Sequence, residues 1–178
     1  MNRKLKLQEL NRSTIEEFKA TDKLPVIVVL DNIRSLSNVG SIFRCADSFG
    51  IVSIYLCGIT PTPPHREITK TAIGATLSVD WKYFEHTEDA INELKENGYQ
   101  IASVEQTEST KKLGQKTFDL GKYAVVMGNE VEGVQQSVID LSDFCLELDQ
   151  FGTKHSLNVS VCAGIVLFEI SRQLRTSS

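Results

Sequence analysis

The chain has 178 residues, of which 41% are hydrophobic and 24% are charged, and its formal net charge is −4. This length and composition are typical of one globular domain, and no apolar stretch reaches the roughly 20 residues that span a bilayer, so we expect no membrane partner. The acidic balance argues against nonspecific nucleic-acid binding through overall charge, although local basic patches can still attract a polyanion.

Residues 1–24 are expected to form a basic, amphipathic N-terminal arm. The arm is mixed in polarity and lacks the apolar centre and cleavage site of a secretory signal, so we expect a cytoplasmic protein. Ser13 followed by Glu16 predicts a capping box before a helix at 15–20, and Pro25 ends the segment. We expect this helix to pack on the domain or on a partner subunit.

The cysteines lie far apart within apolar patterns and include no C-x-x-C pair. A thiol in such surroundings behaves as a small hydrophobic group. We therefore expect no structural zinc, no disulfide scaffold and no metal cofactor from the four positions, Cys45, Cys57, Cys145 and Cys162.

Short apolar runs recur along the chain and predict strands. The first, at 25–31, is continuous and β-branched, as expected for a strand buried on both faces. Comparable runs follow at 52–57, 78–84, 99–105, 123–128 and 144–148. Helical patterns lie between them at 38–49, 87–97 and 134–141. This alternation predicts an α/β fold with a mainly parallel sheet flanked by helices.

The helix after the first strand is expected to begin at Asn38 as its cap and to end at Gly50. Its apolar positions share one face at helical spacing: Val39, Ile42, Phe43, Ala46 and Phe49. Arg44 points nearly opposite that face. It is either an ordinary solvated arginine or, together with Asn32 and Asn38, part of a ligand site at the carboxyl end of the sheet.

A second polar turn follows the run at 123–128. It reads G-N-E-V-E-G, in which Gly128 allows close backbone approach to a ligand and Glu130 adds a carboxylate. The turn matches neither a dinucleotide-binding glycine motif nor a phosphate-binding loop. Alone it indicates no more than a connection between a strand and a helix.

The third polar turn opens the most apolar segment. Residues 157–170 are apolar at nearly every helical angle, which predicts a helix buried on most sides with Ser156 as its N-cap. Capping accounts for Ser156 and Asn158, but not for a loop that also carries Lys154 and His155. Three polar turns, each placed between a buried strand and a helix, suggest one composite pocket.

Taken in order, the three turns resemble the three motifs of the SpoU (TrmH-like) family of RNA 2′-O-ribose methyltransferases, within the SPOUT superfamily. The matching segments are NIRSLSNVGSIFRCADSFGI (32–51), VVMGNEVEGV (125–134) and LELDQFGTKHSLNVSVCAGIVLFE (146–169). TPPHREITKTAIGA (62–75) is similar to the family's linking region. The likeness runs from Pro25 to the C-terminus, so residues 25–178 are expected to form a SpoU-type methyltransferase domain.

The resemblance implies a deep trefoil knot at about 123–172, a homodimer, and S-adenosylmethionine as methyl donor. It implies cofactor contacts at Met127, Gly128, Leu148, Ser156 and Leu157. It assigns catalytic positions to Asn38, Arg44, Glu130, Ser156 and Asn158. The chain departs from the family at Asp149, where a proline is frequent, which puts the shape of the adenine pocket in doubt.

The implied reaction is attack of a ribose 2′-oxygen on the methyl carbon, which makes RNA the substrate. Transfer RNA is expected before ribosomal RNA because the chain is compact. Two alternatives remain open: a noncatalytic RNA-binding dimer of the same fold, and a knotted methyltransferase acting on a base nitrogen. Arg44 is either the general base or a cation that holds phosphate and stabilises the developing alkoxide. The basic side chains available to RNA are Arg3, Lys4, Lys6, Arg12, Arg66, Lys70 and Lys154.

Overall fold

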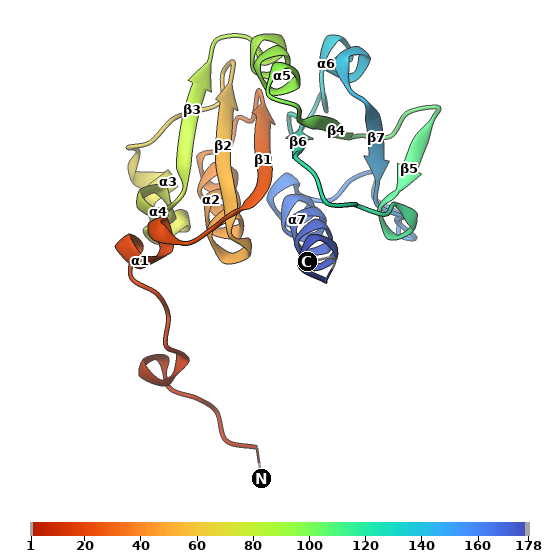
Figure 1. Ribbon diagram of the computed structural model, residues 1–178. Coiled ribbons are helices and arrows are strands. Elements are labelled where there is room, and N and C mark those ends of the chain that lie inside the picture. The colour runs from red at the N-terminus through yellow and green to blue at the C-terminus, as the bar shows by residue number, and fades with distance from the viewer. Residues whose placement is uncertain (1, 177–178) are drawn as a thin grey trace.

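The computed structural model describes residues 2–176, which form one parallel β-sheet with helices on both faces (Figure 1). Within these residues the sheet has seven strands in the order β3-β2-β1-β6-β4-β7-β5, and all neighbouring strands are parallel. The strands are β1 (Leu24–Asp31), β2 (Ile51–Cys57), β3 (Asp80–Phe84), β4 (Gln100–Val104), β5 (Thr110–Lys112), β6 (Tyr123–Met127) and β7 (Phe144–Glu147). The expected parallel α/β sheet is confirmed.

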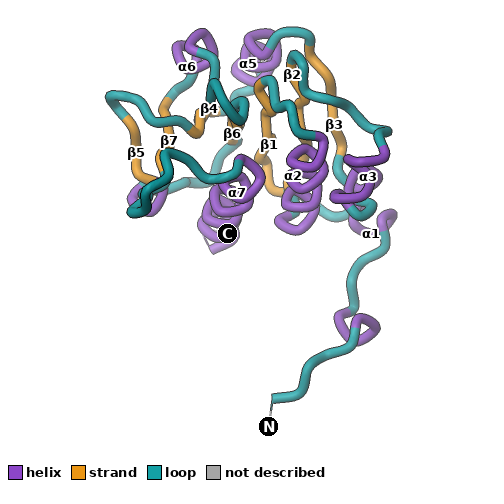
Figure 2. The backbone as a smooth tube through the Cα atoms, turned by 180° about the vertical axis from the view of Figure 1, so that it is seen from behind, coloured by secondary structure: helices purple, strands orange, loops and turns teal. Residues whose placement is uncertain are grey.

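Two groups of helices cover the sheet. On one face, seen in Figure 2, α2 packs against α3, α4 and α7. On the other face α5 packs against α6. The helices are α1 (Ile15–Ala20), α2 (Leu36–Phe49), α3 (Arg66–Ala72), α4 (Ala75–Ser78), α5 (Thr87–Glu96), α6 (Gln136–Leu141) and α7 (Val159–Thr176), with 3₁₀ turns η1 (Leu7–Leu10) and η2 (Leu113–Gln115).

Strand β1 is the centre of both hydrophobic cores. Val28 and Leu30 pack in the cluster that includes α2 and α7, whereas Ile27 and Val29 pack in the cluster that includes α5 and α6. The alternation follows from the two-residue period of a strand. The expectation of a strand buried on both faces is therefore confirmed.

The predicted strands and helices are all present, with ends shifted by at most two residues except for α7, which was expected at 157–170 and runs over Val159–Thr176. Five short elements were not predicted: β5, α3, α4 and the 3₁₀ turns η1 and η2. Strand β5 is a three-residue polar edge strand, Thr-Lys-Lys, without the apolar run by which strands are recognised.

The N-terminal arm extends away from the sheet before α1, which packs against α4 (Figure 1). The helix at 15–20 is confirmed, but its predicted cap is wrong by one residue. Thr14 Oγ1 accepts from the N–H of Glu17 at 3.2 Å, and the Glu17 carboxylate accepts from the N–H of Thr14 at 2.8 Å. Both Ser13 and Thr14 have a glutamate three residues on, so the spacing permits either box.

A fully buried carboxylate closes the end of β1. Asp31 is 0% exposed and accepts four hydrogen bonds: two from Gln135, through its main-chain N–H at 2.9 Å and its side-chain amide at 2.8 Å, one from Thr87 Oγ1 at 2.6 Å, and one from Asn32 Nδ2 at 2.9 Å. Burying a carboxylate is costly unless hydrogen bonds replace its water. Asp31 thus fixes the starts of α5 and α6 to the central strand.

Helix α7 is apolar on two faces. One face packs in the core with α2 through Ala163, Val166 and Ile170 among others, while the opposite face leaves Val161, Ile165 and Phe168 exposed to solvent. The prediction of a helix buried on most sides is wrong for this second face. The sequence could not distinguish an apolar face that meets the core from one that meets solvent.

Gly40 permits the close packing of α2 on α3. A Cβ at this position would lie 2.0 Å from Thr71 Oγ1 and 2.4 Å from the main-chain oxygen of Ile68. We therefore expect Gly40→Ala to lower the free energy of unfolding by about 2–3 kcal/mol, measured by urea denaturation. Gly114→Ala is the control, because no atom lies within 4 Å of its Cβ position. Equal stability of the two variants would show that α3 moves away without cost.

Candidate functional site

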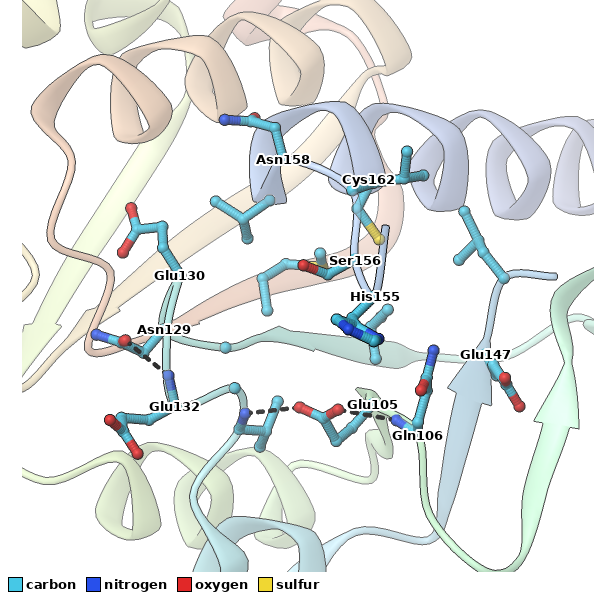
Figure 3. A pocket seen from close by; sticks show the side chains of 18 of the residues that line it. Glu105, Gln106, Asn129, Glu130, Glu132, Glu147, His155, Ser156, Asn158 and Cys162 are labelled. Atoms are coloured by element: carbon cyan, nitrogen blue, oxygen red, sulfur yellow. Dashed lines mark hydrogen bonds between the residues drawn. The ribbon is translucent and has the colours of Figure 1, made fainter. Parts of the chain in front are cut away.

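A cavity of about 720 Å³ opens at the carboxyl ends of β4, β6 and β7, beside the start of α7 (Figure 3). The main lining segments are 104–106 after β4, 127–134 after β6, 146–148 after β7, and 155–159 before α7. Its volume is in the range of small-molecule sites. The carboxyl ends of parallel strands are also where open α/β folds bind ligands.

Most of the residues expected at the site meet in this cavity. The five expected cofactor contacts all line it: Met127, Gly128, Leu148, Ser156 and Leu157. Of the expected catalytic residues, Glu130 and Asn158 line it together with Ser156, whereas Asn38 and Arg44 do not.

Glu130 joins two of the three polar turns. Its carboxylate accepts hydrogen bonds from the main-chain N–H of Arg34 at 2.9 Å and of Ser35 at 3.0 Å, and from Asn38 Nδ2 at 2.9 Å. These donors lie at the N-terminus of α2, where main-chain N–H groups lack helical partners and favour negative charge.

Asn38 extends the connection to the third turn. Its side-chain oxygen accepts from Asn158 Nδ2 at 3.1 Å, and the side chain is mostly enclosed, since the residue is 8% exposed. Asn38 does not cap α2 as predicted. Ser35 does so instead, because the helix begins at Leu36, and its hydroxyl oxygen accepts from the N–H of Asn38 at 3.3 Å. A residue inside the first turn is free to use its side chain elsewhere.

The environment of Glu130 favours its charged form. Partial burial acts to raise the pKa of this carboxyl, but the hydrogen bonds from Arg34, Asn38 and Ser35 outweigh it and hold the pKa below its ordinary value. Glu130 is therefore ionised at neutral pH, with its oxygens engaged by neighbouring loops. Such a group positions other residues and is a poor proton acceptor.

The cap of α7 is Asn158, and the prediction of Ser156 is wrong. Asn158 Oδ1 accepts from the N–H groups of Ser160 at 2.9 Å and Val161 at 3.3 Å, and the helix begins at Val159. Both side chains suit an N-cap, so the sequence does not decide between them. Because Asn158 also donates to Asn38, the start of α7 is tied to α2.

The second turn is folded closely on itself. The N–H of Asn129 donates to the oxygen of Gly133 at 2.9 Å, and the reverse bond is 3.0 Å. A Cβ on Gly128 would lie 2.2 Å from both the carbonyl carbon of Gly133 and the nitrogen of Val134, so only glycine fits at this position. Asn129 Nδ2 also donates to the main-chain oxygen of Asn32 at 2.7 Å, which ties this turn to the first one.

Glu105 is a cavity residue that the sequence did not reveal. It follows β4, and its carboxylate accepts from the N–H groups of Val134 at 3.0 Å and Gln106 at 2.9 Å. A carboxylate at the end of a predicted strand was the available indication, but no motif contains it. Glu105 holds the far end of the second turn.

The cavity is strongly acidic in character. Among the described residues that line it, His155 is the only side chain of basic type, and four are acids: Glu105, Glu130, Glu132 and Glu147. Of these, Glu147 is paired with Lys112 at 2.8 Å. Cys162 also lines it, but burial, and then the nearby charge of Glu105, raises the pKa of this thiol to about 11. The thiol therefore stays protonated and is no nucleophile at neutral pH.

Arg44 lies away from this cavity. It is exposed on the outer face of α2, as its position opposite the apolar stripe predicts, and its main-chain oxygen accepts from Ser48 Oγ at 2.8 Å. The cavity of a single chain thus gathers the expected residues of the second and third turns without the arginine of the first.

Two negative findings apply to residues 2–176. No group of three or more histidine, cysteine, aspartate or glutamate residues there is arranged to hold a metal ion. None of the helices in this part of the chain is both long and apolar enough to cross a membrane.

Glu130→Gln keeps the size of the side chain and removes its charge. We expect a loss of about 1–2 kcal/mol in the free energy of unfolding at neutral pH, because an N–H at the start of α2 loses its acceptor. Since the pKa of Glu130 is lowered by folding, the wild-type advantage is full above the ordinary carboxyl pKa of about 4.3. It is lost as the pH falls through the lowered folded-state pKa.

Urea unfolding over a pH series measures this difference. Glu132→Gln is the matched control, because Glu132 is exposed and its side chain makes no hydrogen bond within residues 2–176. A difference between wild type and Glu130→Gln that stays constant down to acid pH would contradict the charged role of Glu130.

The chain is similar to known proteins over the segment that contains the three polar turns. Residues 25–168 match the model of the SpoU rRNA Methylase family. The chain is 30% identical over 172 residues to the 23S rRNA (guanosine-2′-O-)-methyltransferase RlmB of Vibrio parahaemolyticus, which covers 93% of this chain and 66% of that protein. It is 29% identical over 160 residues to a TrmH family protein of Staphylococcus saprophyticus, and spans 63% of that protein's length.

Solved structures share the fold. The AdoMet-bound rRNA methyltransferase from Sinorhizobium meliloti has a TM-score of 0.80 and 26% identity, covering 88% of this chain and 60% of that one. The TrmH/SpoU tRNA modifying enzyme of A. aeolicus has a TM-score of 0.81 and 23% identity, covering 91% and 81%. Because the family match contains all three polar turns and nearly the whole sheet, the chain belongs to the SpoU rRNA Methylase family.

Proposed function

We propose that the chain is an S-adenosylmethionine-dependent RNA methyltransferase that modifies a ribose 2′-hydroxyl. Its preferred proposed substrate is tRNA, and rRNA is the second choice. The observation that carries the proposal is the hydrogen-bonded series Glu130–Asn38–Asn158, which joins three turns around one cavity. The relatives support it: one is a guanosine-2′-O-methyltransferase of rRNA and another a tRNA modifying enzyme.

The cavity suits this cofactor. S-adenosylmethionine supplies a methyl group activated by a positively charged sulfonium. The carboxylates of the lining favour a cation, while apolar side chains such as Leu148 and Leu157 offer a surface for a flat ring. Gly128 lines the cavity, and glycine is needed there because the turn packs closely on its own backbone. A related structure holds AdoMet, which agrees with this assignment.

The chain's own residues would act mainly by positioning. Glu130 is fully occupied by donors, so we assign it the task of holding Asn38 and the first turn in register with the cavity. Ser156, on the cavity wall, is free of the cap and available to the substrate ribose. Holding the reacting atoms in line accounts for several kcal/mol of barrier lowering in such reactions.

Arg44 is proposed to stay cationic and to stabilise the oxygen as it loses its proton. A guanidinium keeps its proton in proteins and donates hydrogen bonds only, which argues against its acting as the base. Its forked donors suit the phosphate next to the reacting ribose.

We further propose a homodimer formed through the outer face of α7. This face carries a stripe of exposed apolar side chains at helical spacing: Val161, Ile165 and Phe168. Apolar patches of this kind mark contact surfaces, and α2, which carries Arg44, packs beside α7. A dimer offers Arg44 a route to the cavity of the partner subunit.

The trefoil knot at about 123–172 is retained as part of the proposal. Strand β6 lies between β1 and β4, β7 lies farther out, and α7 returns to pack on α2. The crossover before β6 contacts the returning helix, since the N–H of Phe118 donates to Gln173 at 2.8 Å. This contact between the segment before β6 and the C-terminal helix α7 supports the proposed knot.

The direct test is methyl transfer from labelled S-adenosylmethionine to total RNA of a strain lacking the gene, with label located in nucleosides by mass analysis. We expect label in 2′-O-methyl nucleosides and a loss of about 100-fold or more in kcat for Arg44→Ala. Lysine at this position should restore little, because it lacks the forked geometry. Lys95→Ala, on the exposed surface of α5, is the control.

Other outcomes separate the alternatives. Label on a base nitrogen would replace the ribose assignment. Cofactor binding without any transfer would contradict the activity, and RNA binding without cofactor binding would favour a noncatalytic dimer.

Ile165→Glu tests the dimer. A buried unpaired charge is strongly unfavourable, so we expect the variant to sediment as a monomer and to lose methyl transfer while keeping its circular dichroism spectrum. Leu120→Glu is the control on an exposed leucine outside α7. A monomeric wild type, or a fully active monomeric variant, would overturn the proposed interface.

A further inference from the structure

The two most exposed large apolar side chains among those whose burial the structure describes lie on the two loops that supply the cavity lining after β6 and β7. Phe151 is 97% exposed and Val131 is 73% exposed. Val131 lies on the second turn and lines the cavity, and Phe151 follows the lining residue Gln150 on the third turn. Phe151 and Val131 therefore belong to two different loops whose neighbouring residues line the same cavity.

The loop that carries Phe151 does not bury its side chain. Every residue from 149 to 158 is exposed, and no atom lies within 4 Å of the Cβ position of Gly152. An aromatic ring in this setting makes no contribution to the core. Lys154, three residues along, is also exposed and adds a positive charge to the same loop.

We propose that Phe151 is the stacking platform for the base of the nucleotide whose ribose is methylated, with Val131 on the opposite side of the mouth and Lys154 toward a neighbouring phosphate. This inference rests on the proposed function and adds a substrate-positioning residue to it. To bring a 2′-oxygen into the cavity, the nucleotide must leave its helical stack, and its base then needs a new apolar surface. Aromatic side chains provide that surface for unpaired bases of any sequence.

The occupant is RNA for two reasons. The loop reaches the cavity through His155, Ser156 and Leu157, so a ligand part bound at Phe151 is continuous with one bound inside. The platform also combines an aromatic ring with Lys154, a pairing that suits a nucleotide, whereas the outer face of α7 is purely apolar at its exposed positions Val161, Ile165 and Phe168.

The first test measures methyl transfer by Phe151→Ala, Phe151→Leu and Phe151→Tyr on an RNA that the wild type modifies. Loss of stacking should lower kcat/KM for RNA by about 5- to 100-fold in the alanine variant, mainly through KM, with S-adenosylmethionine affinity and sedimentation unchanged. Tyrosine should stay within about threefold of wild type, and leucine should match alanine. Leu120→Ala is the control, an exposed apolar residue outside the cavity.

Full activity of the leucine variant, or a change in sedimentation of the alanine variant, would overturn the inference in favour of an apolar contact with a second subunit.

A second readout does not depend on catalysis. In a Trp81→Phe background, which removes the single natural tryptophan, Phe151→Trp reports base stacking by fluorescence quenching when RNA binds. Quenching supports the platform, and its absence with bound RNA rejects it. If the wild type methylates no RNA, the proposed function fails, while quenching still decides the role of Phe151.

Discussion

The carboxylate of Glu130 is the contact on which the arrangement of the site depends. It belongs to the second turn, yet all its side-chain partners lie at the N-terminus of α2, nearly a hundred residues earlier. Through Asn38 the same contact reaches Asn158 and the start of α7. The other end of the turn is fixed by Asp31 and Glu105, which accept from the N–H groups of Gln135 and Val134. The turn is thus held at both ends by charged acceptors, so its shape exists before any ligand binds.

Such fixing matters because the turns themselves have little apolar material to hold them. Residues 129–133 are partly or fully exposed, and a loop of this kind is ordinarily the mobile part of a fold. Hydrogen bonds to ionised acceptors are about twice as strong as neutral ones, which compensates for the missing core contacts. The rigid layer beneath is the central pair β1 and β6, where every β6 residue is buried. The positions of the cavity loops are therefore set by the sheet, to which the carboxylates of Asp31, Glu105 and Glu130 attach them.

Continuous apolar runs predicted the central strands, which are buried on both faces, and helical periodicity predicted the main helices. The three motifs together predicted which turns meet. Periodicity does not identify β5 or Glu105, since a short polar edge strand and a single glutamate have no pattern. It misplaced the caps at Ser13, Asn38 and Ser156, where several capping side chains occur within three residues and only geometry selects one. Periodicity also did not reveal that the second apolar face of α7 is exposed to solvent, because the sequence shows which residues are apolar but not what each one contacts.

The charge of the cavity constrains how two ligands of opposite sign could share it. Glu147 is paired with Lys112 at 2.8 Å, but Glu105, Glu130 and Glu132 favour a cationic sulfonium and repel phosphate, and no lysine or arginine is among the described residues that line the interior. The phosphates of an RNA substrate must therefore remain outside the cavity, and only the uncharged edge of a ribose enters it. The mouth has the complementary composition, with apolar Phe151 and Val131 and the cation Lys154 exposed on its loops. A neutral hydroxyl is then the part of RNA that can approach the methyl group most closely, so the acidic lining itself favours a sugar oxygen over a phosphate oxygen as the acceptor.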